Sequence, residues 1–171
     1  MNEIWNDDNG HGTHVAGIIA ARNNSIGVLG VAPGAELYAV KVLDQYGGGR
    51  ISDVIEGIEW AVQNEMDLVS MSFGTTEYSQ ALSDSSASAY NAGILLVASA
   101  GNNGDGNLST NDVMYPAKLE SVIAVSAIDQ NNIAVPWNAD GSEVELAAPG
   151  LGIYSTWLDG GYHSMSGTSM A

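Results

Sequence analysis

The sequence of 171 residues contains no cysteine, and its four lysine and arginine residues are far outnumbered by twenty aspartate and glutamate residues. Without cysteine the chain can form neither a disulfide framework nor a thiolate zinc site. The formal net charge of −16 leaves no basic patch that could neutralise nucleic-acid phosphates or bind an anionic membrane surface. These absences exclude nucleic-acid binding and membrane-surface binding, and they indicate a self-repelling acidic surface.

Long hydrophobic runs are also missing, because no apolar segment reaches the ~20 residues that a membrane span needs. The first ten residues, MNEIWNDDNG, have neither a basic nor an apolar region, so we do not expect a signal peptide in them. Apolar residues make up 45% of the chain and charged residues 14%, which indicates a globular protein. The length and the lack of internal repeats predict a single domain over residues 1–171.

Short apolar segments alternate with helix-like segments along the chain. The predicted strands are 37–42 (LYAVKV), 68–72 (LVSMS), 94–100 (ILLVASA) and 121–128 (SVIAVSAI). The predicted helices are 12–22, 51–66 and a small-residue helix near 78–92 that Gly93 ends. Uniformly apolar strands separated by helices predict an α/β fold with a doubly wound, mostly parallel sheet and helices on both faces.

The helix predicted at 51–66 has the clearest periodicity. Five apolar residues fall on one stripe at helical spacing: Ile51, Val54, Ile55, Ile58 and Val62. We expect this stripe to face the sheet and either Ser52 or Asp53 to cap the helix N-terminus.

In parallel α/β sheets the working residues gather beyond the carboxyl ends of the strands. Three polar, glycine-rich segments are candidates: NGHGTHVAG with His11 at a helix entrance, VASAGNNGDG with Asn102 after a strand, and SGTSMA with Ser169. Each has a simpler interpretation when it is taken alone. A lone histidine is usually structural, and Asn-Gly after a strand is usually a turn.

Together these segments carry a family resemblance. In order, HGTHVAGIIAA, NNSIGVLGVAPGAELYAVKVL, MSFG, ASAGNNG and GTSMA closely resemble the catalytic domain of the subtilisin-like serine proteases, from Asn9 to Ala171. The resemblance implies a serine endopeptidase that hydrolyses peptide bonds through an acyl-enzyme. It also implies that residues 1–171 are part of one catalytic domain, truncated at both ends.

The resemblance assigns the catalytic roles. His11 matches the general base, Ser169 the nucleophile and Asn102 the side-chain donor of the oxyanion hole, while His14 matches a structural histidine. These residue types suit the chemistry, because a serine hydroxyl is a weak nucleophile unless a base removes its proton during attack. A histidine can take that proton and later give it to the leaving amine, and an amide can donate to the oxyanion.

The resemblance also implies substrate and metal sites. Two segments would flank a bound peptide: Gly47, Gly48 and Gly49, and Ser72, Phe73 and Gly74. A third segment, made of Ser99, Ala100 and Gly101, would help to line the pocket for the residue before the scissile bond. The loop RNNSIGV matches a calcium site with the Asn24 side chain and the carbonyls of Arg22, Ile26 and Val28 as ligands, and oxygen donors suit Ca²⁺. Tyr115-Pro116 matches a cis proline of the family.

In the family the acid that orients the base lies well upstream of it, and only ten residues precede His11. We therefore expect the catalytic aspartate to lie outside this chain, and neither Asp7 nor Asp8 to replace it. The chain alone is then expected to be nearly inactive. The partners that the resemblance implies are protein or peptide substrates and a pro-segment, with a monomeric enzyme. A secreted location is expected, with an intracellular enzyme as the alternative.

Other interpretations stay open. A metal hydrolase would use His11 and His14, but the HxxH spacing lacks the glutamate of HExxH. An α/β-hydrolase is disfavoured, because GxSxG is absent and the histidine precedes the serine. The main alternative is not an enzyme at all but an inactive or degenerate subtilase fragment.

Overall fold

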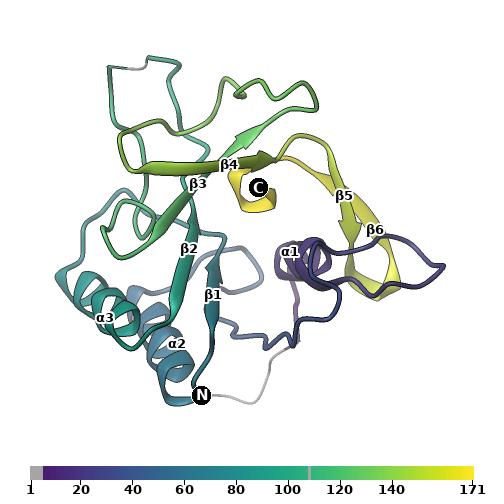
Figure 1. The fold of residues 1–171 in the computed structure, drawn as a ribbon, viewed down its shortest axis with the longest axis horizontal. Coiled ribbons are helices and arrows are strands. Elements are labelled where there is room, and N and C mark those ends of the chain that lie inside the picture. The colour runs from purple at the N-terminus through teal and green to yellow at the C-terminus, as the bar shows by residue number, and fades with distance from the viewer. Residues whose placement is uncertain (1–5, 108) are drawn as a thin grey trace.

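A computed structural model describes residues 6–107 and 109–171 of the chain. Its centre is a parallel sheet of four strands in the order β1 (Leu68–Met71), β2 (Leu95–Ser99), β3 (Ile123–Ile128) and β4 (Val144–Pro149). Figure 1 shows these strands fanning across the molecule with helices to either side. The parallel sheet and flanking helices confirm the predicted α/β fold.

The burial of the two inner strands, β2 and β3, explains why their sequences are apolar. In β2 and β3 most side chains are buried, and Leu96, Ala98, Ala124 and Ala127 are at most 2% exposed. Strands buried on both faces have the uniformly apolar sequences that mark these segments. The register aligns Val97 of β2 with Ser70 on one side and Ile123 on the other, so all three strands run in the same direction.

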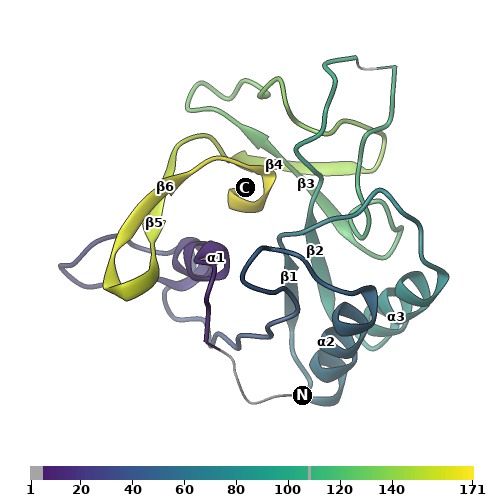
Figure 2. The same cartoon turned by 180° about the vertical axis from the view of Figure 1, so that it is seen from behind.

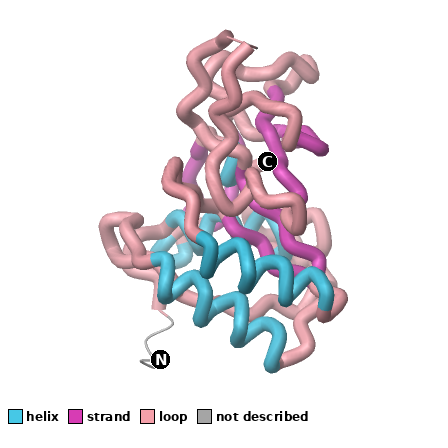
Figure 3. Tube along the Cα trace, turned by 90° about the vertical axis from the view of Figure 1, so that its left-hand side faces the viewer, coloured by secondary structure: helices cyan, strands magenta, loops and turns pink. Residues whose placement is uncertain are grey.

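Two helices cover one face of the sheet. They are α2 (Ile51–Gln63) and α3 (Gln80–Asn91), and Figure 3 shows them side by side. The predicted stripe of α2 is confirmed, since Val54 and Ile58 are buried in the main core and the other three members pack against it. The hydrophobic core therefore lies between these helices and the sheet.

The opposite side holds α1 (His11–Ala20), the antiparallel hairpin of β5 (Ile153–Thr156) and β6 (Tyr162–Met165), and two short 3-10 helices, η1 (Leu158–Gly160) and η2 (Thr168–Met170). In Figure 2 the hairpin lies against α1, and η2 lies between α1 and the sheet. Within the described residues no helix has the length and hydropathy to cross a bilayer.

The packing of α1 against β5 fixes the position of the helix that begins at His11. Ser155 Oγ donates to the carbonyl of His14, and Thr156 Oγ1 donates to that of Thr13, both at 2.8 Å. Gly17 permits this contact, because a Cβ there would lie 2.1 Å from Thr156 Oγ1.

His14 fixes the same helix from inside. It is fully buried, and its Nε2 lies 3.0 Å from the carbonyl oxygens of Ile153 and His163. Because both partners are acceptors, this nitrogen carries the proton. His14 thus joins α1 to both strands of the hairpin, as expected of a structural histidine.

Two expectations were wrong. Residues 37–42 do not form a strand, and much of this segment is exposed. They form no ladder with another described segment, and a β-rich sequence without a neighbouring strand has no partner for its backbone groups. The cap of α2 also differs: the helix begins at Ile51, so Arg50 is the N-cap, and Ser52 and Asp53 lie within the first turn.

Gly10 is the N-cap residue of α1 and has no side chain, so the side chain of Asp7 serves as the capping acceptor in its place. One carboxylate oxygen accepts hydrogen bonds from the backbone N–H groups of Asn9 and Gly10, both at 2.9 Å. The other accepts from the N–H of Thr13 at 2.8 Å and from its hydroxyl at 2.6 Å. Burial raises the pKa of Asp7, but these hydrogen bonds outweigh burial and lower the pKa from 3.8 to about 2.

We predict that Asp7→Ala in the full-length protein lowers the free energy of unfolding by about 1–2 kcal/mol, the usual contribution of a helix cap. Because folding lowers the pKa of Asp7, its contribution is complete above the ordinary value of 3.8 and is lost as the pH falls toward about 2. Chemical denaturation of the wild type and the variant at several pH values tests this.

Asp8→Asn is the matched control, because Asp8 makes an exposed ion pair with Lys41 that should contribute little. Equal losses for the two variants at neutral pH, or a stability difference for Asp7→Ala that does not shrink in acid, would contradict the assignment of Asp7 as the cap.

Candidate active site

Three segments meet beyond the carboxyl ends of β1 and β2. Ser72 follows β1 directly, Asn102 lies three residues after β2, and η2 contains Ser169. Contacts of η2 with α1, β2 and β3 bring the end of the chain into this group. The parallel sheet therefore gathers the predicted residues at one edge, as the strand order requires.

Asn102 and Thr168 form the central polar contact of this edge. Asn102 Oδ1 accepts hydrogen bonds from the backbone N–H of Thr168 at 2.8 Å and from its hydroxyl at 3.0 Å. The same hydroxyl accepts a hydrogen bond from the N–H of Gly101 at 3.2 Å. With Oδ1 held in this way, Nδ2 of Asn102 is the donor left for another partner.

Ser169 and Ser72 make a reciprocal pair. Ser169 Oγ donates to the carbonyl of Ser72 at 3.2 Å, and Ser72 Oγ donates to the carbonyl of Ser169 at 3.1 Å. This pair joins η2 to the segment after β1. Within the described residues, the Ser169 hydroxyl thus bonds to main chain and not to the His11 imidazole.

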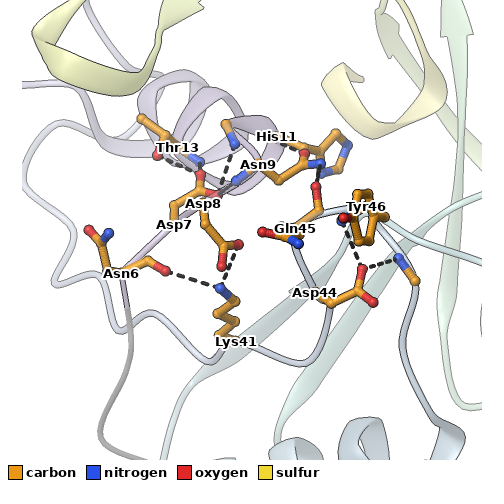
Figure 4. Close-up of polar contacts among 12 residues, drawn as sticks. Asn6, Asp7, Asp8, Asn9, His11, Thr13, Lys41, Asp44, Gln45 and Tyr46 are labelled. Atoms are coloured by element: carbon orange, nitrogen blue, oxygen red, sulfur yellow. Dashed lines mark hydrogen bonds and ion pairs between the residues drawn. The ribbon is translucent and has the colours of Figure 1, made fainter.

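His11 is the first residue of α1, and Asn9 links it to a neighbouring loop, as Figure 4 shows. Asn9 Oδ1 accepts from the backbone N–H of His11 at 3.2 Å, and Asn9 Nδ2 donates to the carbonyl of Gln45 at 2.9 Å. Burial lowers the pKa of the His11 imidazole below its ordinary value, and His14 lowers it further, while the charge of Asp7 raises it. A neutral imidazole is the form that can accept a proton.

The carboxylates nearest in sequence to His11 make other contacts. One oxygen of Asp7 accepts from the turn just before α1, and the other accepts from Thr13 in the first turn of the helix. Asp8 lies 2.6 Å from Lys41 Nζ, which also donates to the carbonyl of Asn6 at 3.2 Å (Figure 4). In the described part of the chain neither carboxylate hydrogen-bonds to the His11 ring.

The loop that contains Gly47, Gly48 and Gly49 is held by Asp44. Its Oδ1 accepts from the N–H groups of Tyr46 at 2.8 Å and Gly48 at 3.0 Å. Gly47 has a left-handed φ of 79°, which glycine adopts without strain, so it turns the chain just before Gly48 and Gly49. The bond from Asn9 to Gln45 places this loop beside the His11 turn.

The other two segments flank the end of the sheet. Ser99, Ala100 and Gly101 are buried, whereas the segment from Ser72 to Gly74 is partly exposed. Ser72 and Ser99, with Ser169, also line a cavity between α1 and the sheet. The Tyr115-Pro116 bond is cis, which confirms the predicted match.

The loop over residues 22–28 is exposed and lies against the hairpin. Asn24 Oδ1 accepts from the N–H of Ile26 at 2.8 Å, which closes a tight turn. Gly27 has a φ of 66°, and a Cβ there would overlap the ring of Tyr162. Among the described residues no group of three or more acidic or histidine side chains could hold a metal ion.

Sequence reasoning missed Thr168 and Asn9 as supporting residues. Thr168 directly precedes Ser169, and Asn9 lies two residues before His11, so their proximity to the predicted site was visible. Their hydrogen-bond partners were not, because Asn102 and Gln45 are 66 and 36 residues away along the chain.

The chain is similar in sequence to several known proteases. Subtilisin DY from Bacillus licheniformis is 50% identical over 170 residues, which cover 99% of this chain and 62% of that protein. A thermostable alkaline protease from Halalkalibacterium halodurans is 53% identical over 167 residues, 98% of this chain and 45% of the relative. Subtilisin E from Bacillus subtilis is 52% identical over 98% of this chain and 44% of the relative.

The chain thus spans roughly half the length of these relatives. A model of the subtilase family matches residues 2–171, which is nearly the entire sequence. The chain therefore belongs to the subtilase family.

Proposed function

We propose that the protein is a serine endopeptidase in which Ser169 is the nucleophile, His11 the general base and Asn102 a donor to the oxyanion. The observation that carries this proposal is the fixed amide of Asn102, whose Oδ1 is held by Thr168 next to Ser169. The relatives support it, because those compared above are named subtilisins or a protease.

In the proposed reaction Ser169 Oγ attacks the carbonyl carbon of the peptide bond, and its proton passes to the His11 imidazole. The carbonyl oxygen becomes an oxyanion, to which Asn102 Nδ2 donates. The C–N bond then breaks, His11 protonates the leaving amine, and an acyl-enzyme on Ser169 remains. A water molecule, deprotonated by His11, hydrolyses the ester and restores the serine.

The acid that orients His11 is proposed to come from outside residues 1–171. The four hydrogen bonds that Asp7 accepts at the helix N-terminus use both of its oxygens. Asp8 pairs with Lys41 instead. Before attack, the Ser169 hydroxyl must also turn from the Ser72 carbonyl toward the imidazole.

Protein or peptide chains are the proposed substrates, held as an added strand between the glycine loop at 47–49 and the segment at 72–74. Main-chain pairing reads the peptide backbone, so it tolerates many side chains. We further propose a monomeric, secreted enzyme that is made with a pro-segment.

A serine-directed fluorophosphonate tests the proposal most simply. The full-length protein should hydrolyse peptides and should be labelled at Ser169, because an activated serine attacks the probe rapidly. Ser169→Ala should lose both properties, whereas Ser166→Ala, at an exposed serine three residues earlier, should keep the labelling. Labelling of neither protein would support the inactive alternative and overturn the proposal.

Asn102→Ala should lower kcat by about 10²–10³ with little change in KM, a magnitude carried over from another subtilase. The reason is that a donor to the oxyanion acts in the transition state and not on the bound substrate. Asn103→Ala is the matched control, because Asn103 is exposed and donates to the carbonyl of Asp112. A loss confined to KM, or equal losses in both variants, would refute the assignment.

We also propose that the loop over residues 22–28 binds Ca²⁺, with the Asn24 side chain and the carbonyls of Arg22, Ile26 and Val28 as ligands. The donor type fits, since the ion prefers oxygen ligands in an irregular loop. These four donors are fewer than the usual ~6–8, so the remaining ligands would come from outside this loop.

If this loop binds calcium only in the folded protein, calcium must raise the melting temperature, with about 2.7 kcal/mol of added stability at 100 times the Kd. Thermal unfolding with calcium and with a chelator measures this, in a Ser169→Ala background that prevents self-digestion. Asn24→Ala should weaken the response, whereas Asn23→Ala should not. A melting temperature independent of calcium would exclude the site.

A further inference from the structure

Met114 lies between two of the segments that the family resemblance assigns to the substrate, residues 72–74 and 99–101. Its backbone N–H donates to the carbonyl of Ala100 at 2.8 Å. The next residue, Tyr115, exchanges two hydrogen bonds of 2.9 Å with Thr75 in an isolated antiparallel bridge. The chain at Met114 and Tyr115 is therefore attached through Met114 to the segment after β2 and through Tyr115 to the segment after β1.

The side chain of Met114 fills the space between these segments. A Cβ built on Gly74 would lie 2.9 Å from Met114 Cβ and 3.4 Å from its sulfur. A Cβ built on Gly101 would lie 2.9 Å from Met114 Cγ and 3.0 Å from the sulfur. Glycine at both positions thus leaves room for a methionine that contacts both walls.

This methionine also reaches the surface. Met114 is partly exposed, whereas its neighbours Val113 and Pro116 are buried. Gly101, which contacts the thioether, immediately precedes Asn102. A side chain that enters beside Asn102, between the two segments, therefore meets the thioether of Met114.

We infer that Met114 is a specificity-determining residue that restricts the position before the scissile bond to small side chains such as those of glycine, alanine and serine. The inference rests on the proposed function, in which the segment at 72–74 flanks the bound peptide, and on the family resemblance, which implies that the segment at 99–101 lines the pocket for this substrate residue. An aromatic ring would need the volume that the thioether occupies. Packed sites resist such overfilling because neighbouring atoms must move.

Two peptide substrates that differ only in alanine or phenylalanine before the scissile bond test this inference in the full-length protein. The wild type should have the higher kcat/KM for the alanine peptide. Met114→Ala should raise the phenylalanine-to-alanine ratio of kcat/KM by at least about tenfold, the lower end of what one mismatched group is worth in a substrate pocket.

Met66→Ala is the matched control. Met66 is also partly buried, but it precedes β1 at the opposite end of that strand and packs on the main core. This variant should keep the ratio of the wild type. If Met66→Ala changed the phenylalanine-to-alanine ratio of kcat/KM by the same amount, the change would come from a general loss of packing and not from the pocket. That result would overturn the inference.

The outcomes separate this inference from the proposed function. If fluorophosphonate labels Ser169 but the wild type prefers the phenylalanine peptide, the inference is wrong while the proposed function stands. The same conclusion follows if Met114→Ala leaves the ratio unchanged. If Ser169 is not labelled at all, the proposed function fails and the inference fails with it. The preference of the wild type tests the inference even if Met114→Ala does not fold.

Discussion

The contact between Asn102 and Thr168 is the constraint on which the candidate site depends. Residues 66 positions apart are joined by two hydrogen bonds to a single amide oxygen, and a third bond from Gly101 holds the threonine hydroxyl. These bonds fix η2 at the end of β2. They also orient the Asn102 amide, so the same hydrogen bonds set both the position of this amide and the direction in which it points. In its proposed role, a donor that is oriented in this way needs no rearrangement when charge develops on the substrate.

His11 is positioned by a separate set of contacts. Asp7 caps α1, His14 and Gly17 hold the helix against the hairpin, and Asn9 joins the helix entrance to the loop at Gln45. The proposed base and the proposed nucleophile thus belong to two separately anchored units, which meet where α1 contacts η2. A change in either anchor should therefore alter the relative geometry of the two groups, even though neither anchor takes part in the chemistry.

The sequence predicted those parts of the fold that burial dictates. The segments that became β1, β2 and β3 are apolar because two are buried on both faces and the third joins the core. The apolar stripe of α2 was also predicted correctly, from the helical spacing of its residues. The strand predicted at residues 37–42 does not form, because a strand needs a neighbouring strand to pair with, and the local sequence does not show whether one is present. The strands β4, β5 and β6 were not anticipated, and exposed residues interrupt their pattern.

The candidate site also combines features that the local sequence reveals with features that depend on the fold. The family resemblance assigned His11, Asn102 and Ser169 to the candidate site, because each lies in a short glycine-rich motif that is visible in the local sequence. The proposed role of Met114 was not visible, since it depends on Gly74 and Gly101, which are distant in sequence from Met114 and close only in the fold. The capping role of Asp7 was likewise hidden, because its partners are backbone groups whose directions follow from the helix.

A double-mutant cycle on kcat/KM tests the central contact most directly, using the wild type, Asn102→Ala, Thr168→Val and the double variant of the full-length protein. If Thr168 acts by holding the Asn102 amide, removing its hydroxyl should lower kcat/KM in the wild type but have almost no further effect once Asn102 is alanine. Equal losses from Thr168→Val in both backgrounds would show that the two residues act independently and would contradict this account.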